Sequence, residues 1–274
     1  MRLPRLLPEV VTPAGPGRIK GLSMAGFSHH GSQPLAMQAI PHPAVTVVFD
    51  LDPGTVIVDG PAGRQQGSIL AGLAFQELRV GCLDLEALQV RLSPLLAHAV
   101  LGVPPTELEG AVIALDDLWG RGAARLQERL SETRSWPDRF HLVEDLVSRR
   151  VAAGRSMPGE VAVAWDRIVH SGGRVRAEEL AAQIGWSRQH LWTRFRSHIG
   201  LSPRRAAKLV RFHHAAHWLA AGRGPARVAA DTGYFDQSHL HRDVQAFTGT
   251  TPGTVARKRS SRWTPPVTRR PAKR

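Results

Sequence analysis

The sequence predicts an α+β protein with a small β-rich N-terminal domain, helices after it, and an all-α C-terminal domain. In that last domain, two helix-turn-helix units are joined by a long helix. Three observations support this prediction. β-branched runs broken by turn residues occupy residues 36–92. Apolar residues recur at three- and four-residue spacing from residue 94 onward. A helix-turn-helix pattern then occurs twice between Val175 and Pro252.

Short strands are predicted in the first part of the chain. The run Val45–Leu51 indicates a strand, Asp52–Gly54 a turn, and Thr55–Val58 the partner strand of a hairpin. Residues 1–35 are rich in Pro and Gly and show no period that assigns them to an element. The strands predict a small barrel or sandwich, with further members at residues 68–73, 77–80 and 87–92.

Helices are predicted next, at residues 94–101, 105–118 and 121–130, and then from Ser135, whose side chain caps a helix start. In that last helix, one apolar stripe is formed by Trp136, Phe140, Val143, Val147 and Val151. The stripe packs either against the β-rich core of its own chain or, as a dimerisation helix, against a second copy. The chain thus divides into residues 1–135, a connecting helix and linker at 136–157, a helical domain at 158–256 and a basic tail at 257–274.

The positive charge of the chain is concentrated near its C-terminus. Residues 1–160 hold 15 Lys and Arg against 17 Asp and Glu, whereas residues 161–256 hold 13 against 6. Residues 257–274 hold 8 basic residues and no acidic ones, and their prolines indicate a disordered tail. This distribution predicts a polyanionic partner for the C-terminal part, and the alternative is a merely solubilising charge.

The single cysteine, Cys82, excludes an intrachain disulfide, and its apolar neighbours indicate a core residue. Cys/His zinc spacing is absent from the sequence. The N-terminus lacks the apolar run of a secretory signal, and no run approaches the length of a membrane span. We therefore expect a cytoplasmic protein that has no membrane partner, no metal and no cofactor.

The tandem units have equivalent parts. The first unit is predicted as a helix at Glu178–Gly185 and a second helix at Ser187–His198, and the other as Pro225–Gly233 and Asp236–Phe247. A Gly-x-Ser/Thr-Pro turn follows each second helix. A long helix from Pro203 to Gly222 joins the units, and its roughly 19 residues span about 28 Å. A repeated helix-turn-helix on a basic background predicts DNA recognition, and closely spaced recognition helices require bent DNA.

Specific residues at these positions carry a family resemblance. The first unit has the pattern Ala182, Gly185, Ser187, Leu191, Phe195, Gly200, Ser202 and Pro203. The second contains Gly233-Tyr234-Phe235-Asp236-Gln237-Ser238-His239-Leu240-x-Arg242, then Phe247-x-Gly249-x-Thr251-Pro252. Together they resemble the C-terminal domain of the AraC/XylS transcription regulators. The chain departs from the aromatic residues frequent in that family at three core positions: Ala206, Val244 and Val255.

The resemblance implies a sequence-specific transcription regulator and favours an activator over a repressor. Its implied partners are double-stranded DNA and RNA polymerase. Residues 1–135 carry no motif of their own, and the resemblance implies that they sense a small-molecule effector or mediate homodimerisation. It implies no enzymatic activity.

The contact residues are predicted on the outward faces of the second helices. Leu191, Phe195 and Ile199 step by four and face the core, which leaves Arg188, Gln189, Trp192, Thr193 and Arg196 outside. The resemblance places Gln189, Trp192 and Thr193 toward bases and Arg196 toward phosphate, with Trp192 packing on a neighbouring helix as an equal alternative. In the second unit the outward residues are Gln237, Ser238, His241 and Arg242. His239 is either an exposed contact or a packed, hydrogen-bonded ring, with packing favoured.

Two other classes of function compete with this interpretation. A metal-binding enzyme would draw on the 13 histidines, and His213 and His217 lie one helical turn apart. However, no carboxylate or protease motif accompanies them, and residues 36–92 contain only His42. A sequence-neutral nucleoid protein would be compatible with the basic tail, but two distinct recognition faces argue against it.

Overall fold

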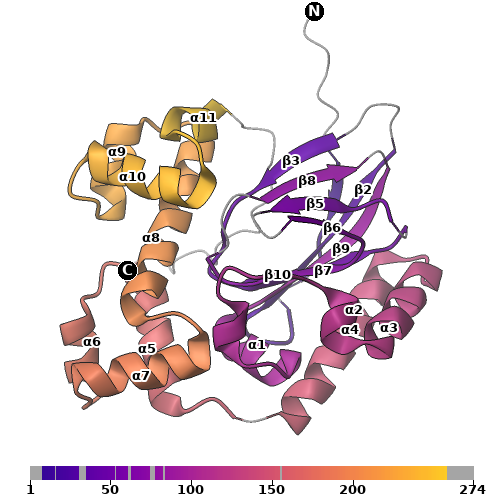
Figure 1. Ribbon diagram of the computed structural model, residues 1–274, viewed down its shortest axis with the longest axis horizontal. Coiled ribbons are helices and arrows are strands. Elements are labelled where there is room, and N and C mark those ends of the chain that lie inside the picture. The colour runs from indigo at the N-terminus through magenta and orange to yellow at the C-terminus, as the bar shows by residue number, and fades with distance from the viewer. Residues whose placement is uncertain are drawn as a thin grey trace, which may run out of the picture.

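Two antiparallel β-sheets form the N-terminal part of the protein in the computed structural model (Figure 1). The structure describes residues 8–15, 17–30, 35–52, 54–60, 63–74, 78–82, 84–154 and 156–257. The larger sheet has the strand order β1 (Glu9–Val11), β2 (Leu22–His29), β9 (Leu85–Leu92), β4 (Val45–Asp50), β7 (Ile69–Ala71) and β10 (Val112–Ala114). The smaller sheet has the order β3 (Leu35–Ala39), β8 (Leu78–Cys82), β5 (Ile57–Gly60) and β6 (Gly63–Gln66).

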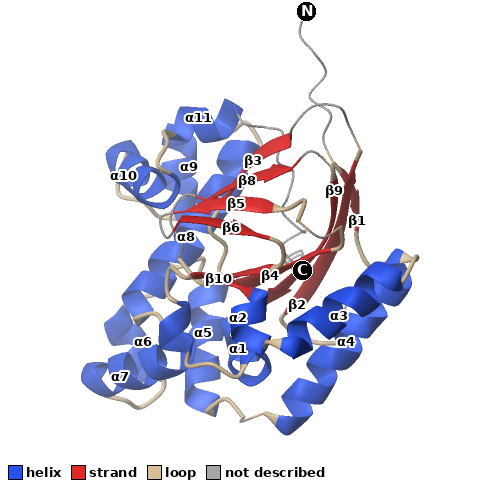
Figure 2. Cartoon of the chain, turned by 45° about the vertical axis from the view of Figure 1, so that its right-hand side comes forward, coloured by secondary structure: helices blue, strands red, loops and turns tan. Residues whose placement is uncertain are grey.

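The alternation of side chains along the central strands explains how the larger sheet is covered on both faces. In β4, Val45, Val47 and Phe49 are buried in one apolar cluster together with side chains of the helices. Val48 points the other way, toward the cluster shared with the smaller sheet. Of the predicted barrel or sandwich, the structure therefore has two packed sheets. The other face of the larger sheet is packed against helices (Figure 2).

Five helical segments follow the strands: α1 (Pro94–Leu101), η1 (Pro105–Leu108), α2 (Leu115–Trp119), α3 (Arg121–Glu132) and α4 (Trp136–Ala153). The Ser135 side chain accepts a hydrogen bond from the Asp138 backbone N–H at 3.2 Å and caps α4, as predicted. Phe140, Val143 and Val147 are buried in the main core, whereas Val151 is 40% exposed. The apolar stripe of α4 therefore packs mainly within its own chain.

Two of the secondary-structure predictions are wrong. The chain from β4 does not return as a hairpin, because β4 pairs with β9 and β7 while β5 pairs with β6 and β8 of the other sheet. The Asp50 carboxylate explains the change of sheet: it accepts hydrogen bonds from the backbone N–H groups of Gly54 and Val56 at 3.0 and 3.2 Å. These bonds fix a loop that redirects the chain; Pro53 of the predicted turn lies outside the described residues.

The second error concerns the helix predicted over residues 105–118. This segment is divided into η1, strand β10 and the short helix α2. Gly110 has a φ of +70°, a conformation that a helix cannot contain, and β10 pairs with β7 at the sheet edge. Sheet pairing and a glycine therefore override the helical spacing of the apolar residues. The sequence also failed to predict β1, β2, β3, β6 and β10.

The C-terminal part is entirely helical (Figure 1). Its elements are α5 (Gly159–His170), α6 (Ala177–Gln183), α7 (Arg188–Ile199), α8 (Pro203–Ala220), α9 (Pro225–Thr232), α10 (Gln237–Thr248) and α11 (Pro252–Arg257). This confirms the predicted fold class, with α8 as the long helix between the two helix-turn-helix units. The proposed domain boundaries stay a prediction, and residues 258–274 of the basic tail lie outside the described residues. Within the part of the chain that is described, every helix is too short or too polar to cross a lipid bilayer.

Candidate nucleic-acid interface

The first helix-turn-helix unit consists of α6, a turn and α7. Gly185 in the turn has a φ of +73°, which favours glycine. The Ser187 side chain caps α7 by accepting a hydrogen bond from the His190 backbone N–H at 3.2 Å. The predicted inward residues of α7 are all buried: Leu191, Phe195 and Ile199 are at most 1% exposed. This packing fixes which face of α7 points to solvent.

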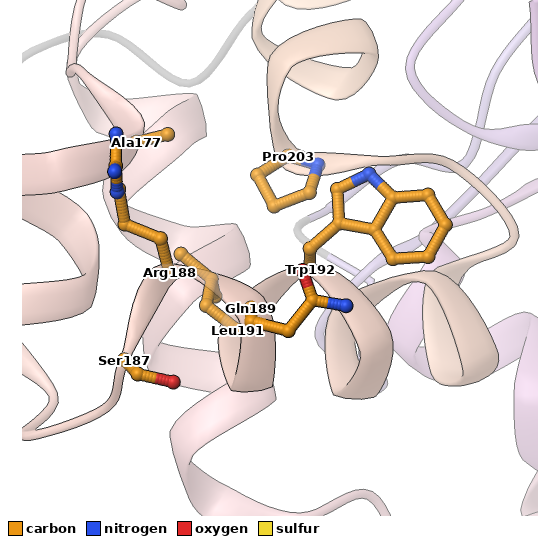
Figure 3. Close-up of a pocket in the computed structure, with 7 residues that line it drawn as sticks. All are labelled: Ala177, Ser187, Arg188, Gln189, Leu191, Trp192 and Pro203. Atoms are coloured by element: carbon orange, nitrogen blue, oxygen red, sulfur yellow. The ribbon is translucent and has the colours of Figure 1, made fainter.

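All five predicted contact residues of α7 are exposed: Arg188, Gln189, Trp192, Thr193 and Arg196. A groove lies along this face and is lined by Ala177, Ser187, Arg188, Gln189, Leu191, Trp192 and Pro203 (Figure 3). In Figure 3 the Trp192 indole lies beside Pro203, the first residue of α8. The groove thus combines an amide, a guanidinium and an aromatic ring, which are groups suited to contacts with base edges.

Trp192 and Arg196 form a stacked pair on this face. The Arg196 guanidinium lies 5.3 Å from the centre of the Trp192 ring. Trp192 remains 44% exposed. Much of the indole is therefore available to a partner. The stacking also limits the conformations of Arg196, so that less side-chain entropy is lost when this arginine binds.

The second unit has the same construction. Gly233 at the end of α9 has a φ of +80°, and the Asp236 carboxylate caps α10 by accepting a hydrogen bond from the His239 backbone N–H at 2.7 Å. Between them, Tyr234 is buried and Phe235 is 93% exposed. Phe235 is a candidate contact residue that sequence reasoning did not select, although its place before the recognition helix was visible.

The four predicted contact residues of α10 are exposed: Gln237, Ser238, His241 and Arg242. The opposite face is buried and includes Leu240, Val244 and Phe247. His239 is half-buried, with its ring edge-on to Tyr234 at 5.1 Å between centroids. The ring of His239 therefore has a packing contact with Tyr234.

The long helix α8 holds the second unit through mixed apolar and polar contacts. The Phe212 ring stacks on Phe247 at 4.5 Å between centroids. The Lys208 ammonium pairs with the nearly buried Asp243 carboxylate at 3.1 Å. Arg211 lies over the Tyr234 ring at 5.0 Å. Lys208 and Arg211 thus have structural partners, whereas Arg204 is exposed and available to solvent or phosphate. The family departures Ala206, Val244 and Val255 are all buried core residues.

The candidate metal ligands on α8 do not share one environment. His213 is 6% exposed, and burial, with the nearby positive charge of Arg91, lowers its pKa to about 3. Its ring contacts the His42 ring at 4.2 Å between centroids. His217 is exposed. Among the described residues there is no group of three or more His, Cys, Asp or Glu that could hold a metal ion. Cys82 is buried, and desolvation raises the pKa of its thiol to about 11.

A further group of contacts was not visible in the sequence. Glu109, which follows η1 in the N-terminal part, pairs with Arg205 of α8 and lies 3.9 Å from Arg196 of α7. The sequence assigned Glu109 to a helix that does not exist, and it contained no signal that would bring this carboxylate to the first helix-turn-helix unit.

Comparison with known proteins identifies the C-terminal domain. Residues 180–258 match the family described as "Helix-turn-helix domain". No curated protein matches the chain in sequence.

Among solved structures, ToxT from Vibrio cholerae O395 is 10% identical with a TM-score of 0.48, covering 89% of this chain and 100% of that chain. The C-terminal domain of AraT, a response regulator from Geobacillus stearothermophilus, is 21% identical with a TM-score of 0.37, covering 40% and 95%. The AraC-like transcriptional activator CuxR is 18% identical with a TM-score of 0.26, covering 69% and 80%. Residues 180–258 are therefore similar in sequence to a helix-turn-helix domain.

Proposed function

We propose that the protein is a sequence-specific transcription regulator that inserts α7 and α10 into consecutive major-groove segments of double-stranded DNA. The observation that carries the proposal is the repeated arrangement of two capped helices, each with its apolar face buried and its predicted contact residues exposed. Recognition helices of this kind read base edges with their N-terminal residues. The two helices lie toward opposite ends of α8 (Figure 1).

Each exposed face has a chemical role in the proposal. Gln189 and Gln237 are suited to adenine, because an amide can donate and accept in one bidentate contact. Thr193 and Trp192 offer apolar contact with thymine methyl groups, and Arg242 offers a bidentate contact with guanine. Ser238 and His241 supply further polar contacts, and Arg196 binds phosphate. Arg188, which is 3.4 Å from Glu178 of α6, takes either a base or a phosphate.

The remaining parts of the chain serve regulation in this proposal. The N-terminal part senses a small-molecule effector or mediates homodimerisation, and the protein acts as an activator that contacts RNA polymerase. The support for these roles is the sequence resemblance to AraC/XylS regulators. The basic tail adds salt-sensitive, sequence-neutral affinity.

A selection from random duplexes tests the proposal. The full chain is compared with the same chain ending at residue 256, which lacks the basic tail. We expect both to select one motif of about 15–20 base pairs with two readable blocks about one helical turn apart. If no motif emerges and binding disappears with the tail, the protein is a sequence-neutral DNA binder and the proposal is wrong.

A further inference from the structure

The N-terminal part rests directly on the end of the first recognition helix. Gly200, which ends α7 with a φ of +89°, lies so close to Pro105 of η1 that an added Cβ would be 2.2 Å from the Pro105 carbonyl oxygen. Helices α7 and α1 are also in contact, and the His98 and His198 rings lie 5.4 Å apart. The two parts are thus packed together at the first helix-turn-helix unit.

Glu109 adds an electrostatic contact at this junction. One of its carboxylate oxygens pairs with the Arg205 guanidinium at 2.5 Å, and the other lies 3.9 Å from a guanidinium nitrogen of Arg196. The Glu109 side chain is 19% exposed, whereas those of Arg196 and Arg205 are 45% and 52% exposed. A mostly buried carboxylate therefore binds two arginines that remain open to the solvent side.

The position of these arginines relates the Glu109 contact to DNA binding. Arg196 lies one and two helical turns after Trp192 and Arg188, so all three follow one exposed stripe of α7. Arg205 lies in the first turn of α8, directly after the turn that ends α7. Guanidinium groups bind carboxylate and phosphate oxygens with the same geometry. Glu109 thus occupies donors of Arg196, on the predicted DNA face of α7, and of Arg205, which pairs with the same carboxylate. Its negative charge repels phosphate there.

Glu109 is also attached to the β-sheets through its backbone. Its segment forms a parallel bridge with Leu73, and the Gly110 N–H donates to the Leu73 carbonyl at 2.8 Å. Gly72 lies so close to Leu108 that any side chain at residue 72 would collide with the Leu108 carbonyl oxygen. The backbone of Glu109 is therefore held against the segment that follows β7. A movement of this edge of the sheet would move Glu109 relative to α7.

We propose that Glu109 is an internal competitor of DNA phosphate: it holds Arg196 and Arg205 when DNA is absent and must release at least one of them when α7 enters the major groove. The N-terminal part thereby lowers the DNA affinity of the first unit. A shift of the β7 edge of the sheet would change the size of this decrease. This inference rests on the proposed function.

The test compares DNA binding of the full chain with two variants that each lose one negative charge. Glu109→Gln removes the competitor, and Glu107→Gln is the control, because Glu107 is an exposed residue of η1 two positions away. At low salt we expect Glu109→Gln to bind the selected duplex about three- to tenfold more tightly than Glu107→Gln, in keeping with a partly exposed ion pair. The dependence of log K on log salt should steepen by about 1–2, because freed arginines displace counterions.

Two further variants make the result specific. Glu109→Asp keeps the net charge but shortens the side chain, so it should also bind DNA more tightly than the unaltered chain. When Arg196 and Arg205 are both replaced by Ala, Glu109→Gln should give no gain over Glu107→Gln. Equal or weaker binding by Glu109→Gln relative to its control would overturn the competitor, while failure of the unaltered chain to select any motif would overturn the proposed function itself.

Discussion

Helices α7 and α10 have similar buried faces but contact different neighbouring elements. In α7 and α10, Leu191 and Leu240 hold equivalent positions and are 1% and 0% exposed. However, α7 contacts α1 and η1 of the N-terminal part, whereas the main contacts of α10 are with α8, α9 and α11. Helix α7 is therefore in direct contact with the N-terminal part, whereas α10 is packed on the connecting helix α8 and its neighbours. Under the proposed function, only the first of the two similar units is placed where the N-terminal part can influence DNA binding directly.

Two matched substitutions test whether the cores of the two units contribute equally to stability. Leu191→Ala and Leu240→Ala each leave a cavity in a fully buried site, and each should lower the free energy of unfolding by about 2–5 kcal/mol. Chemical denaturation of the full chain measures both. Costs that differ by more than this range would show that the two units are not packed alike.

The reading role of the second unit is tested by Arg242→Ala. Because Arg242 is exposed, its loss should leave the stability nearly unchanged. If it reads a base, binding should weaken by about 1–3 kcal/mol and specificity should relax at one position of the second block. Selection from random duplexes with this variant checks the assignment. An unchanged motif would move Arg242 from base to phosphate contact.

Acid should weaken the contact between the N-terminal part and α8. His213 has a pKa of about 3 because of burial and the charge of Arg91, compared with about 6.5 in the unfolded chain. The unfolded state therefore binds more protons between these values, so stability is complete above about pH 6.5 and falls as the pH decreases. At pH 5 the loss from His213 is about 2 kcal/mol.

Denaturation between pH 7 and pH 5 measures this loss. His213→Gln should make the pH dependence shallower, because the buried ionisable group is gone. The exposed His217, one turn later on α8, provides the control. His217→Gln should change the slope less than His213→Gln does, because the charge of His217 is the last of the causes that lower the pKa of His213. The burial of His42 beside His213 also lowers the pKa of His42, so part of the slope should persist in His213→Gln. Equal slopes in all three proteins would contradict the assignment.

The smallest effect on stability is expected at Phe235. It is 93% exposed, so Phe235→Ala should change the free energy of unfolding by no more than about 0.5 kcal/mol. A loss of DNA affinity in this stable variant would add Phe235 to the contact face of the second unit. A clear loss of stability would show instead that the ring has a packing role.

The sequence predicted the C-terminal part far better than the N-terminal part, for a physical reason. Helices α7, α8 and α10 are determined locally: Ser187, Ser202 and Asp236 cap them, and their apolar spacing defines the buried face. The sheets depend on pairing between distant segments, such as β2 with β9. Local spacing cannot encode such pairing, and so the hairpin of Val45–Leu51 with Thr55–Val58 and the helix at residues 105–118 were predicted wrongly.

The candidate site shows the same division. The exposure of the contact residues on α7 and α10 follows from helical periodicity, and so the outward faces were predictable. The pairing of Glu109 with Arg205 was not, because it joins two segments that only the tertiary structure brings together. The His42–His213 contact is unpredictable for the same reason.

One paired selection tests whether α7 and α10 read two separate blocks of DNA. Gln189→Ala alters α7 and Gln237→Ala alters α10, and each is compared with the unaltered full chain on random duplexes. We expect each variant to relax specificity in one block only, and the two affected blocks to differ and to lie about one helical turn apart. Relaxation of the same block by both variants, or of neither block, would contradict tandem reading.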